Sequence, residues 1–230
     1  MKILAVDTSS QSCGVCLMED GAVRVEISLD NGQTHSRHLM KMIMDALEYA
    51  QWGPGEIDGY AVVVGPGSFT GLRIGIAAVK GLAASGNKEI AAVSSLDALA
   101  FQCGAASHMI CCIMDARKHE VYTARYRIRE GVPVKIQGET VTSMERAIVD
   151  IEEPCLFAGD GAILYRQMIK DKMGAEAHFL PADDHRIRPS TVAGIGLLKF
   201  EKNEAELPEY LMPNYIRSSD ARMNSTWGQK

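Results

Sequence analysis

Residues that could do chemistry stand where apolar runs end. Asp7, Thr8 and Ser9 follow the apolar run 2–6, and Asp115 ends a second apolar run at 109–114. Acidic and hydroxyl side chains at the end of a strand either reach into a cleft or close an Asx or ST turn on their own backbone. Both interpretations remain open for Asp7, Thr8 and Ser9.

A glycine-rich turn joins the apolar run 60–64 to a helical pattern that starts at Ser68. Pro66 fixes its own φ, Gly65 and Gly67 supply backbone freedom, and Ser68 is placed to cap the helix. Such turns often bind phosphate, but Thr70 stands where a P-loop or a dinucleotide fingerprint requires glycine. We therefore interpret the turn as tight packing of a strand against a helix.

Two pairs of potential metal ligands are better explained by structural roles than by metal binding. Cys13 and Cys16 lie in an expected strand, where residues three apart point to opposite faces, and no second pair follows at zinc-finger spacing. We expect buried thiols. His35 and His38 open an expected helix without a third ligand nearby.

Two later segments are weaker candidates. Gly159-Asp160-Gly161 precedes a helix and is either a phosphate contact or a plain strand-to-helix turn. Asp183-Asp184-His185 is expected to be a solvated loop.

Length and composition fit an ordinary globular protein with a substantial core. The chain has 230 residues, a net charge of −5 and six cysteines. The negative charge argues against a broad electrostatic contact with nucleic acid or an anionic membrane. No apolar run approaches membrane-spanning length and Asp7 interrupts any signal-peptide core, so we expect a cytoplasmic protein with free thiols.

The pattern of elements repeats. Hydrophobic periodicity predicts the order β-β-β-α-β-α-β-α over residues 1–104 and again over 105–230. Residues 207–217 form an extended, proline-marked segment, which we call the strap, and the last dozen residues are expected to be frayed.

Two helices of the first half are more apolar than one core requires. Apolar residues of the helix near 36–49 spread well beyond the stripe of about 100° that a helix on a single core needs. The helix from Ser68 carries only two charges, Arg73 and Lys80, which share one stripe, and Gly71 and Gly75 leave a groove for a neighbouring helix. A second surface should therefore cover these helices.

Two such halves side by side resemble the actin-like ATPase (ASKHA, ribonuclease H-like) fold, an α/β architecture of sugar kinases, chaperone ATPases and actin. In that superfamily the first strand's Asp and the hydroxyls after it face phosphates and metal. The resemblance implies that Asp7, Thr8 and Ser9 are cofactor-binding residues.

Several motifs resemble the TsaB (YeaZ-like) family, relatives of the TsaD/Kae/Gcp family in tRNA threonylcarbamoyladenosine synthesis. The matching segments, by number, are 3–9, 35–36, 65–73, 94–99, 114–117, 120–122 and Pro213-x-Tyr215-x-Arg217. The resemblance implies a non-catalytic scaffold that binds and orders TsaD, the enzyme that modifies the adenosine next to the anticodon. TsaE joins the pair, and tRNA is reached only through the complex.

Family precedent places the contact with TsaD on the first two helices, in an intermolecular four-helix bundle. Without TsaD the same surface would form a homodimer. The candidate interface residues are Leu39, Met42, Ile43, Ala46, Leu72, Gly75, Ile76 and Val79.

The resemblance also implies that the catalytic metal site is absent. The paralogue holds its metal with a His-x-x-x-His pair, and the matching positions here are Ser95 and Leu99, neither of which offers a ring nitrogen. No cofactor is then held by the chain itself, with an adenine nucleotide at the complex interface left open. The alternatives are an active actin-like ATPase or phosphotransferase and, less favoured, a metallopeptidase.

Overall fold

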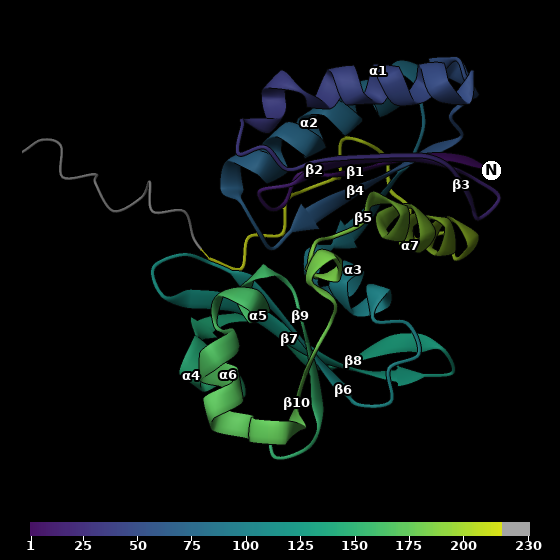
Figure 1. Ribbon diagram of the computed structural model, residues 1–230. Helices are drawn as coiled ribbons and strands as arrows, with labels where there is room; N and C mark the ends of the chain where they lie inside the picture. The colour runs from purple at the N-terminus through teal and green to yellow at the C-terminus, as the bar shows by residue number, and fades with distance from the viewer. Residues whose placement is uncertain (218–230) are drawn as a thin grey trace, which may run out of the picture.

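The computed structural model describes residues 1–217, so the predicted fraying of the last dozen residues lies outside the described part. The first half follows the predicted order (Figure 1). Its elements are β1 (Lys2–Asp7), β2 (Cys13–Glu19), β3 (Ala22–Leu29), α1 (Leu39–Ala50), β4 (Gly59–Gly65), α2 (Phe69–Gly86), β5 (Ile90–Ser94) and α3 (Ser95–Gln102).

The second half repeats the same order. Its elements are β6 (Met109–Asp115), β7 (Glu120–Arg129), β8 (Val132–Ser143), α4 (Met144–Ile148), β9 (Cys155–Ala158), α5 (Asp160–Leu164), α6 (Arg166–Met173), β10 (Ala177–Phe179) and α7 (Pro189–Glu201). The sheets have the orders β3-β2-β1-β4-β5 and β8-β7-β6-β9-β10, so each places its first strand in the centre. The predicted duplication is confirmed at the level of topology.

The first sheet is buried on both faces. Strands β1 and β4, which pair in parallel, are almost wholly buried apolar runs. Such runs are typical of strands covered on both sides. Helix α1 packs on β2 and β3, helix α2 packs mainly on β4, and Figure 1 shows both on one face of the sheet.

Helix α7 covers the opposite face of the first sheet, although it ends the second half of the sequence. Its approach requires residues without side chains at two points. A Cβ on Gly14 would lie 2.3 Å from Pro189 Cγ, and one on Gly196 would lie 2.6 Å from Ala61 Cβ. The limits 1–104 and 105–230 therefore describe the repeat in the sequence, whereas the chain returns to the first sheet at α7.

Helix α3 lies between the two sheets and connects the halves. It packs against β4 and β5 of the first sheet and against β6, β7 and β8 of the second. The Tyr126 hydroxyl donates a hydrogen bond to Asp97 at 2.8 Å, and Lys135 forms an ion pair with the same carboxylate at 2.9 Å.

Several predicted boundaries differ from the structure. The single helix that the predicted order places between β9 and β10 is two helices, because the backbone at Tyr165 (φ −104°, ψ 19°) leaves the helical region. The helix expected from residue 36 becomes α-helical only at Leu39, after a 3₁₀ turn at His35–Arg37. Strand β8 continues to Ser143 and leads directly into α4.

The expected solvated loop at Asp183-Asp184-His185 is a 3₁₀ turn with a buried histidine. His185 packs inward because backbone carbonyl oxygens flank both of its ring nitrogens. Nδ1 is 3.0 Å from the Gly159 oxygen and Nε2 is 2.9 Å from the Leu180 oxygen. The prediction of a solvated loop is therefore wrong for His185.

The predicted buried thiols are confirmed for Cys13 and Cys16. Burial raises the pKa of Cys13 to about 11 and the pKa of Cys16 to about 12. Both thiols therefore stay protonated and unreactive at neutral pH. None of the helices within residues 1–217 has the length and apolar character needed to span a bilayer.

Candidate functional site

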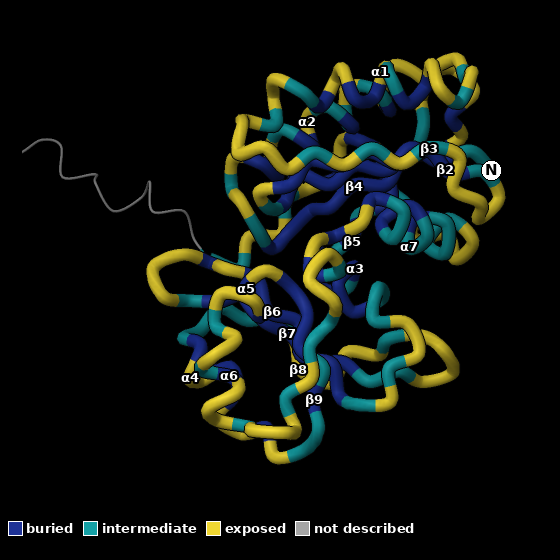
Figure 2. The backbone as a smooth tube through the Cα atoms, viewed as in Figure 1, coloured by how far each residue is buried: buried dark blue, intermediate teal, exposed yellow. Residues whose placement is uncertain are grey.

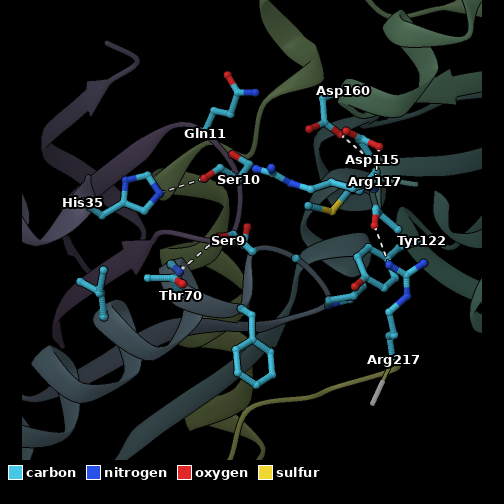
Figure 3. A pocket seen from close by; sticks show the side chains of 18 of the residues that line it. Ser9, Ser10, Gln11, His35, Thr70, Asp115, Arg117, Tyr122, Asp160 and Arg217 are labelled. Carbon is cyan, nitrogen blue, oxygen red and sulfur yellow. Dashed lines mark hydrogen bonds between the residues drawn. The ribbon is translucent and has the colours of Figure 1, made fainter. Parts of the chain in front are cut away.

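A cleft of about 880 Å³ separates the two halves where their central strands end. Its walls come from the segment after β1, the turn before α2, the segment after β6 and the strap (Figure 3). In α/β folds, binding sites usually lie in the crevice outside the carboxyl ends of the parallel strands. This cleft is therefore the candidate site.

The first wall rests on a buried carboxylate. Asp7 Oδ1 accepts hydrogen bonds from the Ser9 amide at 2.9 Å and from the Ser9 hydroxyl at 2.7 Å. Asp7 Oδ2 is buried and has no hydrogen-bond partner within residues 1–217. Burial raises the pKa of Asp7 to about 6, against the opposing effect of the two bonds from Ser9.

Glycines bring helix α2 unusually close to this wall. A Cβ on Gly67 would lie 2.3 Å from the Ser9 carbonyl oxygen, one on Gly71 would lie 2.1 Å from the Thr8 oxygen, and one on Gly75 would lie 2.3 Å from Thr8 Oγ1. Thr8 Oγ1 in turn donates to the Gly71 oxygen at 2.8 Å. The predicted groove for a neighbouring helix is thus wrong, because Thr8 of the same chain fills it.

Of the three predicted cofactor-binding residues, only Ser9 lines the cleft. All three side chains are buried, with 1%, 0% and 1% of their surface exposed, but Asp7 and Thr8 do not reach the cleft wall. As they stand, these two residues hold the end of β1 against Ser9 and α2. The Asx-type turn that the sequence left open is present, since Asp7 accepts from the amide two residues on.

The second wall follows β6. Asp160 Oδ1 accepts a hydrogen bond from the Asp115 amide at 3.0 Å, and Asp115 Oδ1 accepts from the Arg117 amide at 2.8 Å. Arg117, Lys118 and His119 all adopt left-handed φ values of 54° to 61°. Figure 3 shows the Arg117 side chain extending across the cleft toward Ser10 of the first half.

His35 and Gly67 line the first half's side of the same cleft. His35 Nε2 is 2.9 Å from the Ser10 carbonyl oxygen, whereas His38 Nε2 is 2.8 Å from the Gln33 side-chain oxygen. The two rings therefore serve different neighbours. Within residues 1–217, no group of three or more His, Cys, Asp or Glu side chains is arranged to hold a metal ion.

Three segments distant in the sequence converge on the cleft. The segments 65–73, 114–117 and 213–217 all contribute residues to its walls. Sequence reasoning picked out each segment separately but had no means of placing them together. The strap forms a third wall of the cleft, and its Pro-x-Tyr-x-Arg pattern was the feature of the sequence that could have indicated this role.

The eight predicted partner-facing residues lie against the chain's own core. All are buried in the described structure, and Met42 and Ile76 are the most exposed of the seven that carry a side chain, at 6%. Ser95 and Leu99, which the family resemblance predicted to stand at the positions of metal ligands, are also buried. The apolar side chains that stay exposed on α1 are different ones, namely Met40, Met44 and Tyr49. Figure 2 shows exposed stretches alternating with buried ones along this helix.

Comparison with known proteins identifies relatives across the whole chain. The family model described as TsaD, tRNA N6-adenosine threonylcarbamoyltransferase, matches residues 30–225. The tRNA threonylcarbamoyladenosine biosynthesis protein TsaB of Bacillus subtilis is 32% identical over 233 residues, which is 100% of both chains. Its namesake in Escherichia coli is 36% identical over 134 residues, 57% of each chain.

Solved structures agree with these sequence relatives. YeaZ from Pseudomonas aeruginosa matches with a TM-score of 0.81 and 28% identity, over 93% of this chain and 99% of that one. Component A of (R)-2-hydroxyglutaryl-CoA dehydratase from Acidaminococcus fermentans matches with a TM-score of 0.54 and 12% identity, over 88% and 98%. The second likeness concerns the fold alone, which is the predicted actin-like architecture.

Proposed function

The chain belongs to the TsaD family, among its TsaB relatives, and from this premise we propose that it is the subunit that binds and orders TsaD. It acts in the biosynthesis of threonylcarbamoyladenosine in tRNA. The transfer itself is assigned to TsaD, and this chain serves as a non-catalytic partner. Its contact with tRNA is made through the complex.

The observation that carries the scaffold role is the uncovered outer face of α1 and α2. Met40 and Met44, one turn apart on α1, are 45% and 66% exposed. On α2 the exposed positions include Ala77, Gly81 and Ala84, which give a smooth apolar surface. Exposed methionines beside small residues form a surface that can pack closely against helices of another protein.

We therefore propose an interface that lies part of a helical turn outward from the eight predicted residues. The eight buried residues hold α1 and α2 on the first sheet, and their exposed neighbours are the ones offered to TsaD. In the absence of TsaD we propose that two copies of this chain associate through the same face. TsaE is proposed to join the assembled pair.

The non-catalytic role is supported by the positions that match the paralogue's metal ligands. Ser95 and Leu99 are closed off in the interior, with 0% and 1% exposure. Neither side chain supplies the imidazole nitrogen that such a metal requires.

A substitution on the outer face tests the scaffold role without disturbing the core. Met44→Glu places a charge in the proposed contact, and Val132→Glu on β8, an exposed apolar position of the other half, is the matched control. We expect Met44→Glu to abolish co-elution with TsaD in size exclusion and to reduce modification in a reconstituted tRNA assay. If Met44→Glu binds TsaD as tightly as Val132→Glu does, this face is not the docking surface.

A nucleotide in the cleft is the second candidate, favoured by the cleft's volume and by the polar groups that line it from both halves. Ser9 is the one predicted cofactor residue on the wall, so the proposed contact with an adenine nucleotide narrows to Ser9 and its neighbours. Calorimetry with ATP and magnesium distinguishes the roles. Binding together with turnover by the isolated chain would make it an ATPase, whereas binding only in the presence of TsaD would place the nucleotide at the complex interface.

A further inference from the structure

The strap touches both halves of the molecule along its length. Just before the strap, the chain runs beside the free edge of the first sheet, where Glu206 and Ile90 exchange backbone hydrogen bonds of 2.8 and 3.0 Å. Leu211 is buried at 1% exposure, and its carbonyl oxygen accepts a hydrogen bond from Lys80 of α2 at 3.1 Å. Figure 1 shows the strap passing from the first sheet down to the second half.

An aromatic cluster holds the strap to the start of α2. The rings of Tyr215 and Phe69 stack with centroids 4.4 Å apart. The Arg73 guanidinium lies 3.9 Å from the Phe69 centroid, and Arg73 Nε donates to the Tyr215 hydroxyl at 3.0 Å. Arg73 and Lys80, the two charges on α2, thus both contact the strap.

The end of the strap is fixed to the second half. Asn214 bridges the halves, because its amide donates to the Val64 oxygen at 2.7 Å and its side chain donates to Glu139 of β8 at 2.9 Å. Arg217 donates to the Ala116 oxygen at 2.9 Å and forms an ion pair with Glu120. Both acceptors belong to the β6–β7 hairpin that carries Arg117.

We propose that the strap is a clasp that sets the separation of the two halves across the cleft. Besides the contacts of Asn214, Tyr215 and Arg217, the described halves are joined by the packing of α3 between the sheets and by the segment that leads to α7, where Arg186 forms an ion pair with Asp30 at 2.7 Å. The strap residues 214–217 form one wall of the cleft, so releasing them removes a wall and a link together. With the clasp open, α3 and the segment before α7 are left as the hinge, and the cleft widens.

The contacts of the clasp have the strength expected of a reversible device. They are hydrogen bonds, most of them to a charged group, one partly exposed ion pair and one stacked pair of rings, each of which is weak where water can compete. An extended segment held by such contacts opens locally at much lower cost than the sheets unfold. The cleft can therefore open without loss of the folded halves.

Distances between spin labels on the two halves test the clasp. Labels are placed at Ser36→Cys and Arg146→Cys, both exposed, in a chain whose half-buried Cys103 is replaced by serine. We expect a single narrow distance distribution for the native clasp. Tyr215→Ala combined with Arg217→Ala should shift it to longer distances and broaden it.

Three further variants keep the outcome interpretable. Glu120→Gln weakens the clasp from the second half without altering the strap, and it should broaden the distance distribution. Tyr215→Phe keeps the stacked ring and should change the distribution less than the other clasp variants do. Arg24→Ala, which breaks an exposed ion pair with Glu19 inside the first half, is the control and should change nothing. An unchanged distribution in both clasp-opening variants, with native thermal unfolding, would overturn the proposal.

Discussion

At the end of β1, burial destabilises the charged form of Asp7 while hydrogen bonds from Ser9 stabilise it. Asp7 is almost fully buried, yet one of its oxygens has no hydrogen-bond partner among the described residues. A buried carboxylate is stable only when its charge is compensated, and here two bonds from Ser9 compensate it in part. Thr8 and the α2 glycines fit together with no spare volume. The stability of this corner therefore depends on protonation and on the size of single side chains.

Replacing Asp7 by asparagine should stabilise the protein at neutral pH. Burial raises the pKa of Asp7 from 3.8 to about 6, so the folded state binds the proton more tightly than the unfolded state does. Stability from this group is complete below pH 4 and is lost as pH rises through about 6, a loss on the order of 3 kcal/mol. Asp7→Asn keeps the acceptor for Ser9 and cannot ionise.

Urea unfolding of both proteins between pH 4 and pH 8 checks this expectation. The stability advantage of Asp7→Asn should grow between pH 4 and pH 6 and then level off. A stability advantage that does not change with pH would mean that the charge on Asp7 does not destabilise the folded protein.

Gly75→Ala should destabilise the protein although alanine favours helices. The new Cβ would lie 2.3 Å from Thr8 Oγ1, which already donates to Gly71, so we expect a loss of about 1–3 kcal/mol. Gly81→Ala on the same helix is the control, because no atom lies within 4 Å of its Cβ position. That variant should gain about 0.5–1 kcal/mol. Equal unfolding free energies for the two variants would contradict the close contact.

At the scale of elements, the two helices α1 and α2 each have an inner and an outer apolar surface. On α1 the inner surface includes Leu39, Met42 and Ile43, and the outer one includes Met40 and Met44. A glutamate on either surface would damage function, but for different reasons. Only the outer substitution reports on a partner, because the inner one destroys the packing on the sheet.

Thermal unfolding of two neighbouring variants separates these surfaces. Met42 is 6% exposed, so Met42→Glu buries an unpaired charge and should cost more than about 3 kcal/mol. Met44 is 66% exposed, so Met44→Glu should change stability by less than about 0.5 kcal/mol. If Met44→Glu melts as early as Met42→Glu, its effect on TsaD binding would reflect unfolding.

At the scale of the whole molecule, neither half is closed by its own sequence. The face of the first sheet that carries Gly14 and Ala61 is covered by α7, from the far end of the chain. The strap then continues along α2 to the β6–β7 hairpin. The first sheet is therefore completed by α7, the last helix of the described chain.

A chain that ends at Gly104 should fail to form a stable monomer. Without α7 one apolar face of the first sheet is open to water, which favours aggregation. Joining residues 187–206 to Gly104 through a glycine-serine linker restores the cover and should restore cooperative unfolding. Size exclusion and thermal melts decide the matter. A monomeric, cooperatively folded 1–104 would show that α7 is dispensable for the first sheet.

The sequence by itself determined the element order, the duplication, the tight turn at Gly65–Gly67 and the excess of apolar surface on two helices. These follow from local periodicity and from residues with restricted or permissive backbones, which are readable without neighbours. Only the tertiary structure decided which side of α1 and α2 faces the sheet, because a helical wheel gives relative angles and no absolute orientation. It also decided that Thr8 fills the α2 groove, that α7 returns to the first sheet and that the strap spans both halves, since these contacts join residues far apart in the chain.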